Sequence, residues 1–214
     1  MSDTLHLQKI KTRGLKTETL IYFKVGWNPI TRFHSYAEWG LPRQYKQNRQ
    51  ERRLWLPQGF VIPTFFQERP IKLKIRTEGK PKYVQVTGSS SNLSFFGHSI
   101  LKPYVLLESE FDAMLLFQEV GDLCVPVALG GAAQEPDAYS YNLLQKAPLI
   151  LFALDFDLPG KKAYAYWKSR YPNLFAWPTP YEKSAGDAFK SGCDLRKWIA
   201  TGITHCDQRL QDCL

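Results

Sequence analysis

The sequence predicts an α/β protein, in which a parallel sheet flanked by helices follows a small basic α+β subdomain. Three observations predict it. Apolar runs alternate with helical patterns after Pro103, short alternating or β-branched runs lie between Leu54 and Gly97, and the net charge changes sign between these two parts. At 214 residues, 44% of them hydrophobic, the chain is long enough for one core with a smaller subdomain attached.

The first part begins with short helices and turns, expected over residues 8–40. Thr17 is a suitable N-cap, and Asn28-Pro29 closes the segment. Residues 41–53 are polar and strongly basic, which predicts an exposed loop. Strands are then expected in the runs FVIPTFF, IKLKIRT and KYVQVTG, which turn residues separate.

The run 71–76 alternates apolar and cationic residues. Successive side chains of a strand point to opposite faces, so its cations share one face. These cations are Lys72, Lys74 and Arg76. The pattern predicts a half-buried strand with a positive outer surface.

After Pro103 the pattern alternates between strands and helices. Strands are expected in YVLLE, VPVALGG, LILFALD and LFAWP, and helices in SEFDAMLLFQEVG, EPDAYSYNLLQKA, GKKAYAYWKSRY, DAFKSG and DLRKWIATG. Such alternation is typical of right-handed crossovers and a parallel sheet. The expected domains are residues 1–102 (basic), 103–180 (sheet) and 181–214 (helical).

The charge is divided unequally between the two halves. Residues 1–103 hold 18 Lys/Arg and 6 Asp/Glu (+12), and residues 104–214 hold 10 and 14 (−4). This asymmetry favours a polyanion bound by one part and cations bound by the other, although a solvated basic surface is also consistent with it.

The sequence also bears on the cellular location of the protein. No apolar stretch approaches the ~20 residues of a membrane span, and the polar N-terminus lacks a signal peptide's apolar core, so we expect a cytoplasmic protein without a membrane partner.

The four cysteines form no C-x-x-C pair. Free thiols and no zinc are expected, with half a zinc site at His205, Cys206 and Cys213 as the weaker alternative.

Carboxylates follow two of the expected strands. Asp155 and Asp157 end LILFALDFD, Glu108 ends YVLLE, and Asp112 lies one helical turn later. Carboxyl ends of neighbouring parallel strands meet at one sheet edge, so Glu108, Asp155 and Asp157 would converge if these strands are neighbours. Such a group suits Mg²⁺ or Mn²⁺. Each carboxylate alone is also typical of a turn or a helix cap.

Here LLESEFDAM followed by ALDFDLPGKKA resembles the Toprim domain shared by bacterial-type primases, topoisomerases and several nucleases. Glu108, Asp112, Asp155 and Asp157 match its Glu, Asp and Asp-x-Asp positions, and Ser109 replaces the usual Gly. The resemblance implies a Toprim-type sheet.

A wider resemblance, over about residues 10–200, is to the RNA-polymerase core of DnaG-type primases, especially compact primases of phages and mobile elements. It rests on RGLKTETLIYFKVGWNP, on LPQGFVIPTF with IKLKIR and KPKYVQVTGSS, and on VALGGA. It implies that Arg76, Lys82 and Tyr83 contact template or nucleotide, although Tyr83 is equally consistent with core packing.

Two departures from that family stand out. The sequence has no Cys/His set for the zinc ribbon that such primases usually carry. The family's Lys-Asp-Pro-x-Asp/Glu motif is KSAGDAF, with Ser184 at the first Asp position and only Asp187 retained.

The resemblance implies a primase-type nucleotidyltransferase that joins NTPs into RNA on single-stranded DNA. Glu108, Asp155 and Asp157 would hold the metal, Asp187 would be an outer or second-metal ligand, and Asp112 would stabilise the site through backbone amides or Lys161. Lys72, Lys74, Arg76 and Lys82 would contact phosphates. Trp27, Trp39 and Trp55 are interpreted as core residues, with base-stacking platforms as the weaker alternative. A separate zinc-ribbon or helicase protein is a possible partner. Alternatives are an inactive or accessory nucleic-acid-binding protein and a Toprim nuclease.

Overall fold

The computed structural model describes residues 2–131, 134–154 and 157–211. The chain forms two compact units, Met1–Thr19 with Asn92–Leu214, and Leu20–Ser91. We call them the sheet unit and the basic unit. This division differs from the expected boundaries, because the first helix and the C-terminal helices both belong to the sheet unit.

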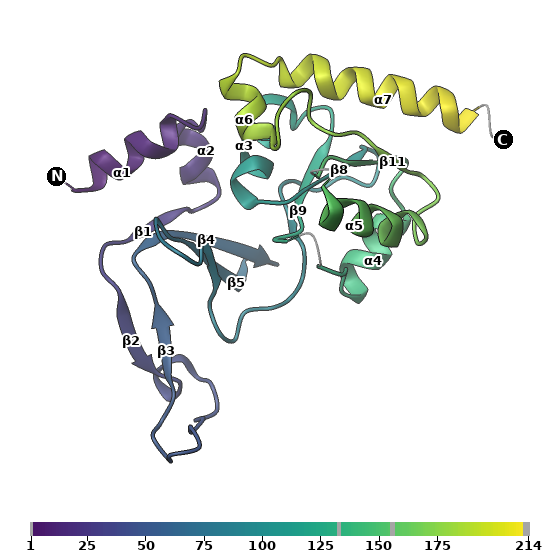
Figure 1. The fold of residues 1–214 in the computed structure, drawn as a ribbon. Coiled ribbons are helices and arrows are strands. Elements are labelled where there is room, and N and C mark those ends of the chain that lie inside the picture. The colour runs from purple at the N-terminus through teal and green to yellow at the C-terminus, as the bar shows by residue number, and fades with distance from the viewer. Residues whose placement is uncertain (1, 132–133, 155–156, 212–214) are drawn as a thin grey trace. The chain divides into compact units, whose positions relative to one another are not determined.

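The sheet unit contains a five-stranded sheet in the order β11-β10-β8-β9-β7 (Figure 1). Its strands are β7 (Ser94–Phe95), β8 (Tyr104–Leu107), β9 (Val125–Ala128), β10 (Ile150–Phe152) and β11 (Leu174–Ala176). The last four are parallel, as expected, and β7 adds an antiparallel edge. All four residues of the central β8 are buried, which explains its continuous apolar run.

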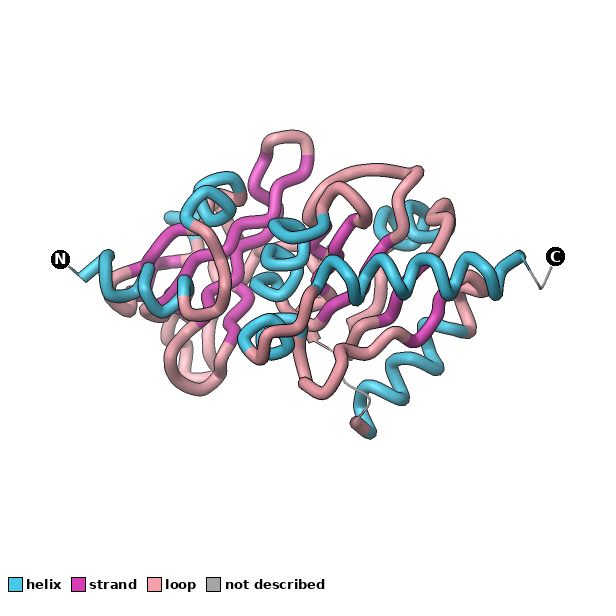
Figure 2. The backbone as a smooth tube through the Cα atoms, turned by 90° about the horizontal axis from the view of Figure 1, so that it is seen from above, coloured by secondary structure: helices cyan, strands magenta, loops and turns pink. Residues whose placement is uncertain are grey.

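Helices cover both faces of this sheet (Figures 1 and 2). The helices of the unit are α1 (Ser2–Lys11), α3 (Glu110–Val120), α4 (Ala138–Gln145), α5 (Leu158–Lys168), α6 (Ala185–Lys190) and α7 (Leu195–Gln211), with α2 (Thr17–Tyr22) at the unit boundary. Helix α3 packs on β8 and β9 and contacts α6 and α7. On the other face, Leu144 of α4 and Trp167 of α5 share a core cluster with Leu106 and Phe152. The sequence predicted α3 to α7, although α7 is longer than expected, and it did not predict α1.

Four of these helices begin at a residue whose side chain caps the backbone. The caps are Ser109 for α3, Asp137 for α4, Asp157 for α5 and Ser184 for α6. Each accepts a hydrogen bond from a first-turn N–H, which typically stabilises a helix by about 1 kcal/mol. Local sequence therefore fixes where these helices begin.

The basic unit contains a four-stranded antiparallel sheet in the order β1-β4-β5-β6. Its strands are β1 (Gly26–Asn28), β4 (Gly59–Phe66), β5 (Arg69–Arg76) and β6 (Tyr83–Gln85). A separate two-stranded ribbon pairs β2 (Arg32–Ser35) with β3 (Arg53–Leu56), and the short helix η1 (Ala37–Trp39) follows β2. The expectation of only helices and turns over residues 8–40 was wrong for β1 and β2. Both form by pairing with distant strands, since β1 pairs with β4 and Ser35 of β2 pairs with Arg53 of β3, 18 residues later in the sequence.

The expected positive outer surface of β5 was also wrong. Lys72 and Lys74 are 4% and 6% exposed, and Arg76 is half-buried. Because β5 is an inner strand, its cations lie beside cross-strand neighbours, and Lys74 pairs with the buried Ile62. Aliphatic lysine stems can pack on such apolar surface.

The three tryptophans interpreted as core residues differ in burial. Trp39 and Trp55 are 40% and 38% exposed, so that interpretation was wrong for them. Trp27 is half-buried, with its ring 4.7 Å from the ring of Phe60. None of the helices in the described part of the chain is long and apolar enough to cross a membrane.

Candidate functional site

The candidate site lies at the carboxyl edge of the five-stranded sheet. Strands β8 and β10 are parallel neighbours, with Leu106 paired to Phe152, which confirms the expected adjacency. Glu108 directly follows β8, Asp157 precedes α5 after β10, and both are exposed. Asp155 lies outside the described residues. The convergence of the three carboxylates therefore stays a prediction, and the strand order supports it.

The backbone at Glu108 is fixed by the loop after β9. Leu129 N–H donates to the carbonyl of Leu107 (2.9 Å), and Gly130 N–H donates to that of Glu108 (2.8 Å). Gly130 has φ 83°, a left-handed conformation that favours glycine. The VALGGA motif therefore places its glycine loop beside Glu108.

Asp157 is the N-cap of α5, which is the helix-capping role that the sequence left open for a carboxylate after a strand. Its Oδ1 accepts a hydrogen bond from Gly160 N–H at 2.9 Å. A carboxylate has two oxygens and about four lone-pair positions, so this bond leaves acceptor capacity for a metal ion. Capping and metal binding are compatible roles for this residue.

Asp112 is 6% exposed and connects the starts of two helices. It accepts hydrogen bonds from Ser109 Oγ (2.5 Å) at the start of α3 and from Gly186 N–H (3.0 Å) in the first turn of α6. A Cβ at Gly186 would lie 2.7 Å from Asp112 Oδ1, so the contact requires a glycine. Lys161 is exposed and makes no hydrogen bond or ion pair with Asp112 among the described residues.

Ser184 and Asp187 form a reciprocal cap at α6. Asp187 N–H donates to Ser184 Oγ (3.2 Å), and Ser184 Oγ donates to Asp187 Oδ2 (2.9 Å). Lys190 lies 3.7 Å from the other carboxylate oxygen. Ser184 thus supplies the helix cap that an aspartate would supply at this position. The role of Asp187 as a metal ligand stays a prediction.

The donors at this edge are carboxylate oxygens, which suit a hard divalent ion. Among the residues that the structure describes, no three His, Cys, Asp or Glu side chains gather into a metal-binding group. A three-carboxylate site at this edge would need Asp155 beside Glu108 and Asp157. These residues fit Mg²⁺ or Mn²⁺ by chemistry.

Three cysteines, Cys124, Cys193 and Cys206, are free thiols, and Cys213 lies outside the described residues. Burial raises the pKa of the Cys124 thiol to about 12. Zinc binds thiolates, so a thiol that stays protonated at neutral pH is a poor ligand. The expectation of no zinc stays a prediction.

In the basic unit, the side chains of Lys74 and Arg76 both lie close to the ring of Tyr83. Lys74 Nζ and Arg76 Cζ lie 5.3 Å and 6.0 Å from the centroid of Tyr83. Lys82 is exposed, and Lys72 is buried. The structure therefore brings together three of the five expected nucleic-acid-binding residues, two on β5 and one on the adjacent β6.

Sequence reasoning missed Gln118, which holds the N-terminal segment on α3. Its Oε1 accepts hydrogen bonds from Lys16 N–H (2.7 Å) and Thr19 Oγ1 (2.9 Å), and its Nε2 donates to the Gly14 carbonyl (2.9 Å). Gly14 has φ 86°, and a Cβ there would clash with the ring of Phe189. A glutamine within a helix gives no sequence signal for such long-range contacts.

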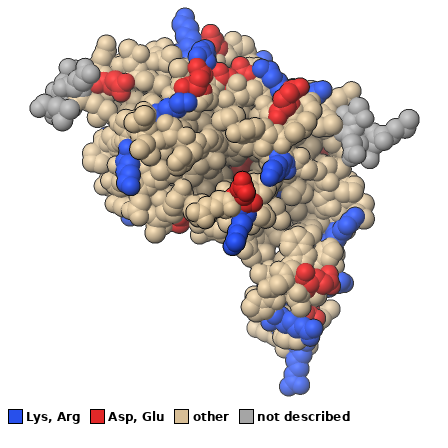
Figure 3. Space-filling view, turned by 180° about the vertical axis from the view of Figure 1, so that it is seen from behind, with Lys and Arg blue, Asp and Glu red and all other residues tan. Residues whose placement is uncertain are grey.

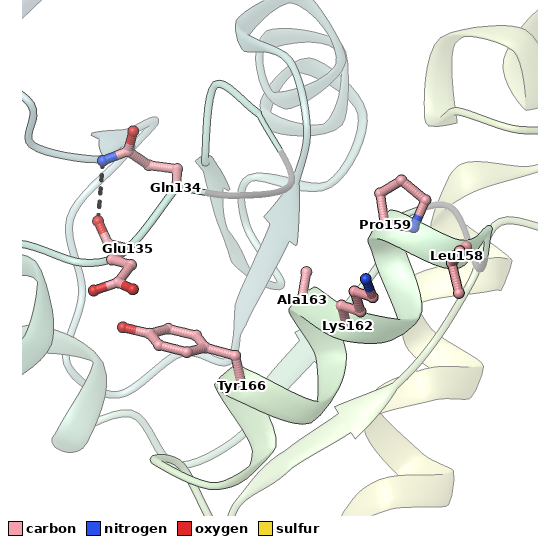
Figure 4. Close-up of a pocket in the computed structure, with 7 residues that line it drawn as sticks. All are labelled: Gln134, Glu135, Leu158, Pro159, Lys162, Ala163 and Tyr166. Atoms are coloured by element: carbon pink, nitrogen blue, oxygen red, sulfur yellow. Dashed lines mark hydrogen bonds between the residues drawn. The ribbon is translucent and has the colours of Figure 1, made fainter.

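A pocket of about 430 Å³ lies beside α5 (Figure 4). Its wall is mostly apolar, and Tyr166 faces the carboxylate of Glu135 across it. Burial, and then a hydrogen bond with Glu135, raise the pKa of Tyr166. Of the candidate metal ligands that the structure describes, Glu108, Asp157 and Asp187 do not line this pocket.

Solved structures of primases have a similar fold. A DNA primase domain from Pseudomonas aeruginosa has a TM-score of 0.64 and 19% identity, over 86% of this chain and 67% of that one. A DnaG primase catalytic domain bound to single-stranded DNA has a TM-score of 0.65 and 14% identity, over 94% and 72%. The Aquifex aeolicus primase, with zinc-binding and RNA polymerase domains, has a TM-score of 0.63 and 22% identity, over 91% and 55%.

No family model matches the sequence, and no curated protein matches it significantly. The chain has the mixed α/β fold of a DnaG-type primase catalytic core, as the sequence predicted.

Proposed function

We propose that this chain is the catalytic core of a DNA primase, a metal-dependent nucleotidyltransferase that makes short RNA primers on single-stranded DNA. The observation that carries the proposal is the parallel pairing of β8 with β10 within a primase-core fold. This pairing brings Glu108 and Asp157 to the same sheet edge, and under the proposal Asp155 would join them there.

The acidic edge would bind the metal through Glu108, Asp155 and Asp157, with Asp187 as a further ligand. When bound, Mg²⁺ or Mn²⁺ would neutralise triphosphate charge and lower the pKa of the primer 3′-hydroxyl. Asp112, through its bond to Gly186 N–H, would position α6 and hence Asp187.

The basic unit would bind template and incoming nucleotide through phosphate contacts. Its contributors would be the half-buried Arg76 and the exposed Lys82, because Lys72 and Lys74, which the sequence also suggested, are buried. Such contacts carry little sequence information, and they weaken as salt rises. Tyr83 would hold Lys74 and Arg76 in place through its ring, and base stacking is its alternative role.

One observation favours a second candidate, an accessory nucleic-acid-binding protein without activity. Ser184 replaces an acidic residue of the primase motif, and its hydroxyl is used for helix capping. This leaves one fewer carboxylate for a second metal ion. A nuclease that used the same carboxylates would differ from both candidates because its product would be shortened DNA.

The test is to incubate the purified chain with single-stranded DNA, labelled NTPs and Mg²⁺ or Mn²⁺, with dNTPs in a parallel reaction. Short RNA products are expected, reduced by roughly 10²-fold or more in Glu108→Gln and Asp155→Ala, because losing a metal ligand costs several kcal/mol of transition-state stabilisation. Asp207→Asn, at an exposed position of α7, is the control and should retain synthesis.

Each other result selects a different function. Shortened template would favour a nuclease, and salt-sensitive binding without any product would favour the accessory protein. If product appears only after a zinc-ribbon or helicase protein is added, initiation depends on that partner. Products undiminished in both Glu108→Gln and Asp155→Ala would overturn the proposed site.

A further inference from the structure

The β2–β3 ribbon presents an aromatic pair to solvent. Phe33 and Trp55 lie directly opposite each other in the antiparallel register and are 54% and 38% exposed. The next residue, Leu54, points to the other face, is 1% exposed and packs in the unit's core with Tyr36 and Ile75. The ribbon is therefore anchored by one face, and its aromatic face is left for contact.

The segment joining the two strands continues the ribbon as an ordered loop. Arg52 N–H donates to the Gln44 carbonyl (2.7 Å), and Lys46 N–H donates to the Gln50 carbonyl (2.8 Å). The loop presents Tyr45, which is 57% exposed. The loop backbone thus extends the aromatic surface beyond the paired strands.

Positive charge surrounds these aromatic side chains. Residues 32–56 contain six Arg/Lys and two Glu, and Figure 3 shows the cations on the surface of this ribbon. Both glutamates have partners, because Glu38 Oε2 lies 2.9 Å from His34 Nδ1 and Glu51 lies 3.8 Å from Arg43.

Three of the six cations are available for a ligand. Arg32, Arg49 and Arg52 form no ion pair with any described residue. Arg53 donates to the Phe33 carbonyl (2.9 Å), which holds its guanidinium next to the aromatic pair. An aromatic platform edged by guanidinium groups is chemically complementary to a flexible strand of bases and phosphates.

We infer that this ribbon, residues 32–56, is a second binding surface for single-stranded nucleic acid, on which Phe33 and Trp55 stack bases and Arg49 and Arg52 bind phosphates. The inference rests on the proposed function for the identity of the strand as template DNA. Stacking is sequence-tolerant, so the ribbon would hold the template without selecting its sequence.

The stacking arm of the test measures binding of labelled oligo(dT) to the full chain without metal or nucleotide. Trp55→Leu and Phe33→Leu should each weaken binding by roughly 5- to 100-fold, because an aromatic–base stack is lost. Trp55→Phe should bind nearly as wild type. The control is Tyr141→Leu in α4, whose residue is 39% exposed and lies in the other unit.

The charge arm measures the same affinity as a function of salt. Arg49→Gln/Arg52→Gln should reduce the slope of log K against log salt by about 1.4, roughly 0.7 for each phosphate contact to a single strand. The matched control, Lys146→Gln/Lys197→Gln, removes the same charge from exposed positions of the sheet unit and should leave the slope near the wild-type value. Unchanged thermal unfolding shows that the variants are folded.

The outcomes separate this inference from the proposed function. Glu108→Gln should lose primer synthesis and keep oligo(dT) binding. If the ribbon variants bind oligo(dT) with wild-type affinity and salt slope, the inference that the ribbon binds single strands is refuted, even if the wild-type chain makes primers. If binding depends on the ribbon but the wild-type chain makes no primers, the inference about the ribbon is supported and the proposed primase function is refuted. Equal loss of affinity for duplex DNA, or binding only to an acidic protein, would overturn the assignment to single strands.

Discussion

The carboxyl edge of the sheet unit and the β2–β3 ribbon of the basic unit both concentrate charge, but they hold it differently. At the edge, Asp112 and Asp157 accept hydrogen bonds from the backbone of helix first turns. On the ribbon, Arg32, Arg49 and Arg52 are exposed and form no ion pair with described residues. The acidic charges are therefore part of the fold, whereas these basic charges are displayed on its surface.

The two regions should therefore respond differently to substitution. A carboxylate at the edge has a structural role and, under the proposal, a chemical one, so its loss affects stability and activity together. A ribbon cation can be removed with a stability change within about 0.5 kcal/mol, as is usual for surface substitutions. Binding is then the property that changes.

The largest stability effect should come from Asp112→Ala. The substitution removes the acceptor for the Gly186 amide in a nearly water-free position, so we expect the free energy of unfolding to fall by about 2–4 kcal/mol. Urea unfolding monitored by circular dichroism measures it. Asp112→Asn keeps one acceptor oxygen and should cost less.

The control for this substitution is Asp207→Ala, which removes an exposed carboxylate of α7 and should change stability by less than about 0.5 kcal/mol. If Asp112→Ala were no more damaging than this control, the structural role given to the edge would be refuted.

A smaller effect is expected at Ser184. Ser184→Ala removes the α6 cap, so the free energy of unfolding should fall by about 1 kcal/mol. Ser184→Thr keeps the hydroxyl and should be nearly neutral. Thermal unfolding of the two variants measures the difference, and equal stability would show that the cap contributes nothing.

The smallest effect is expected at Glu38, on the ribbon side of the comparison. A hydrogen bond with His34, and then the Ser35 backbone amide, lower the pKa of this exposed carboxyl from its ordinary value of 4.5. A lowered acid pKa stabilises the folded state above the ordinary value, and this contribution is lost as pH falls through the lowered value. Glu38→Gln should therefore melt slightly below wild type at neutral pH and converge with it in acid. A melting difference that grows as pH falls below 4.5 would contradict this sign.

Much of the sheet unit was predictable, because its signals are local. Periodicity and length separated strands such as β8 from helices such as α3, and helix caps follow from short spacings such as Ser109 to Asp112. The alternation of strands and helices then predicted the parallel sheet. The adjacency of β8 and β10, and so the edge shared by Glu108 and Asp157, was the condition on which the predicted site depended.

The basic unit was predicted less well, because its structure depends on non-local pairing. Nothing local to Gly26–Asn28 or Arg32–Ser35 indicates a strand, and each becomes one only against β4 or β3. The alternation in β5 showed which residues share a face, but it did not reveal that the cationic face is covered.

The fold class, the order of strands and helices in the sheet unit and the positions of Glu108 and Asp157 after strand ends all follow from local sequence patterns. The burial of Lys72 and Lys74, the exposure of Phe33 and Trp55, and the hydrogen bond from Gly186 to Asp112, 74 residues away, follow instead from long-range packing. The physical reason is that periodicity and capping depend on neighbours within a few residues, whereas burial and long-range hydrogen bonds depend on which distant segments pack together.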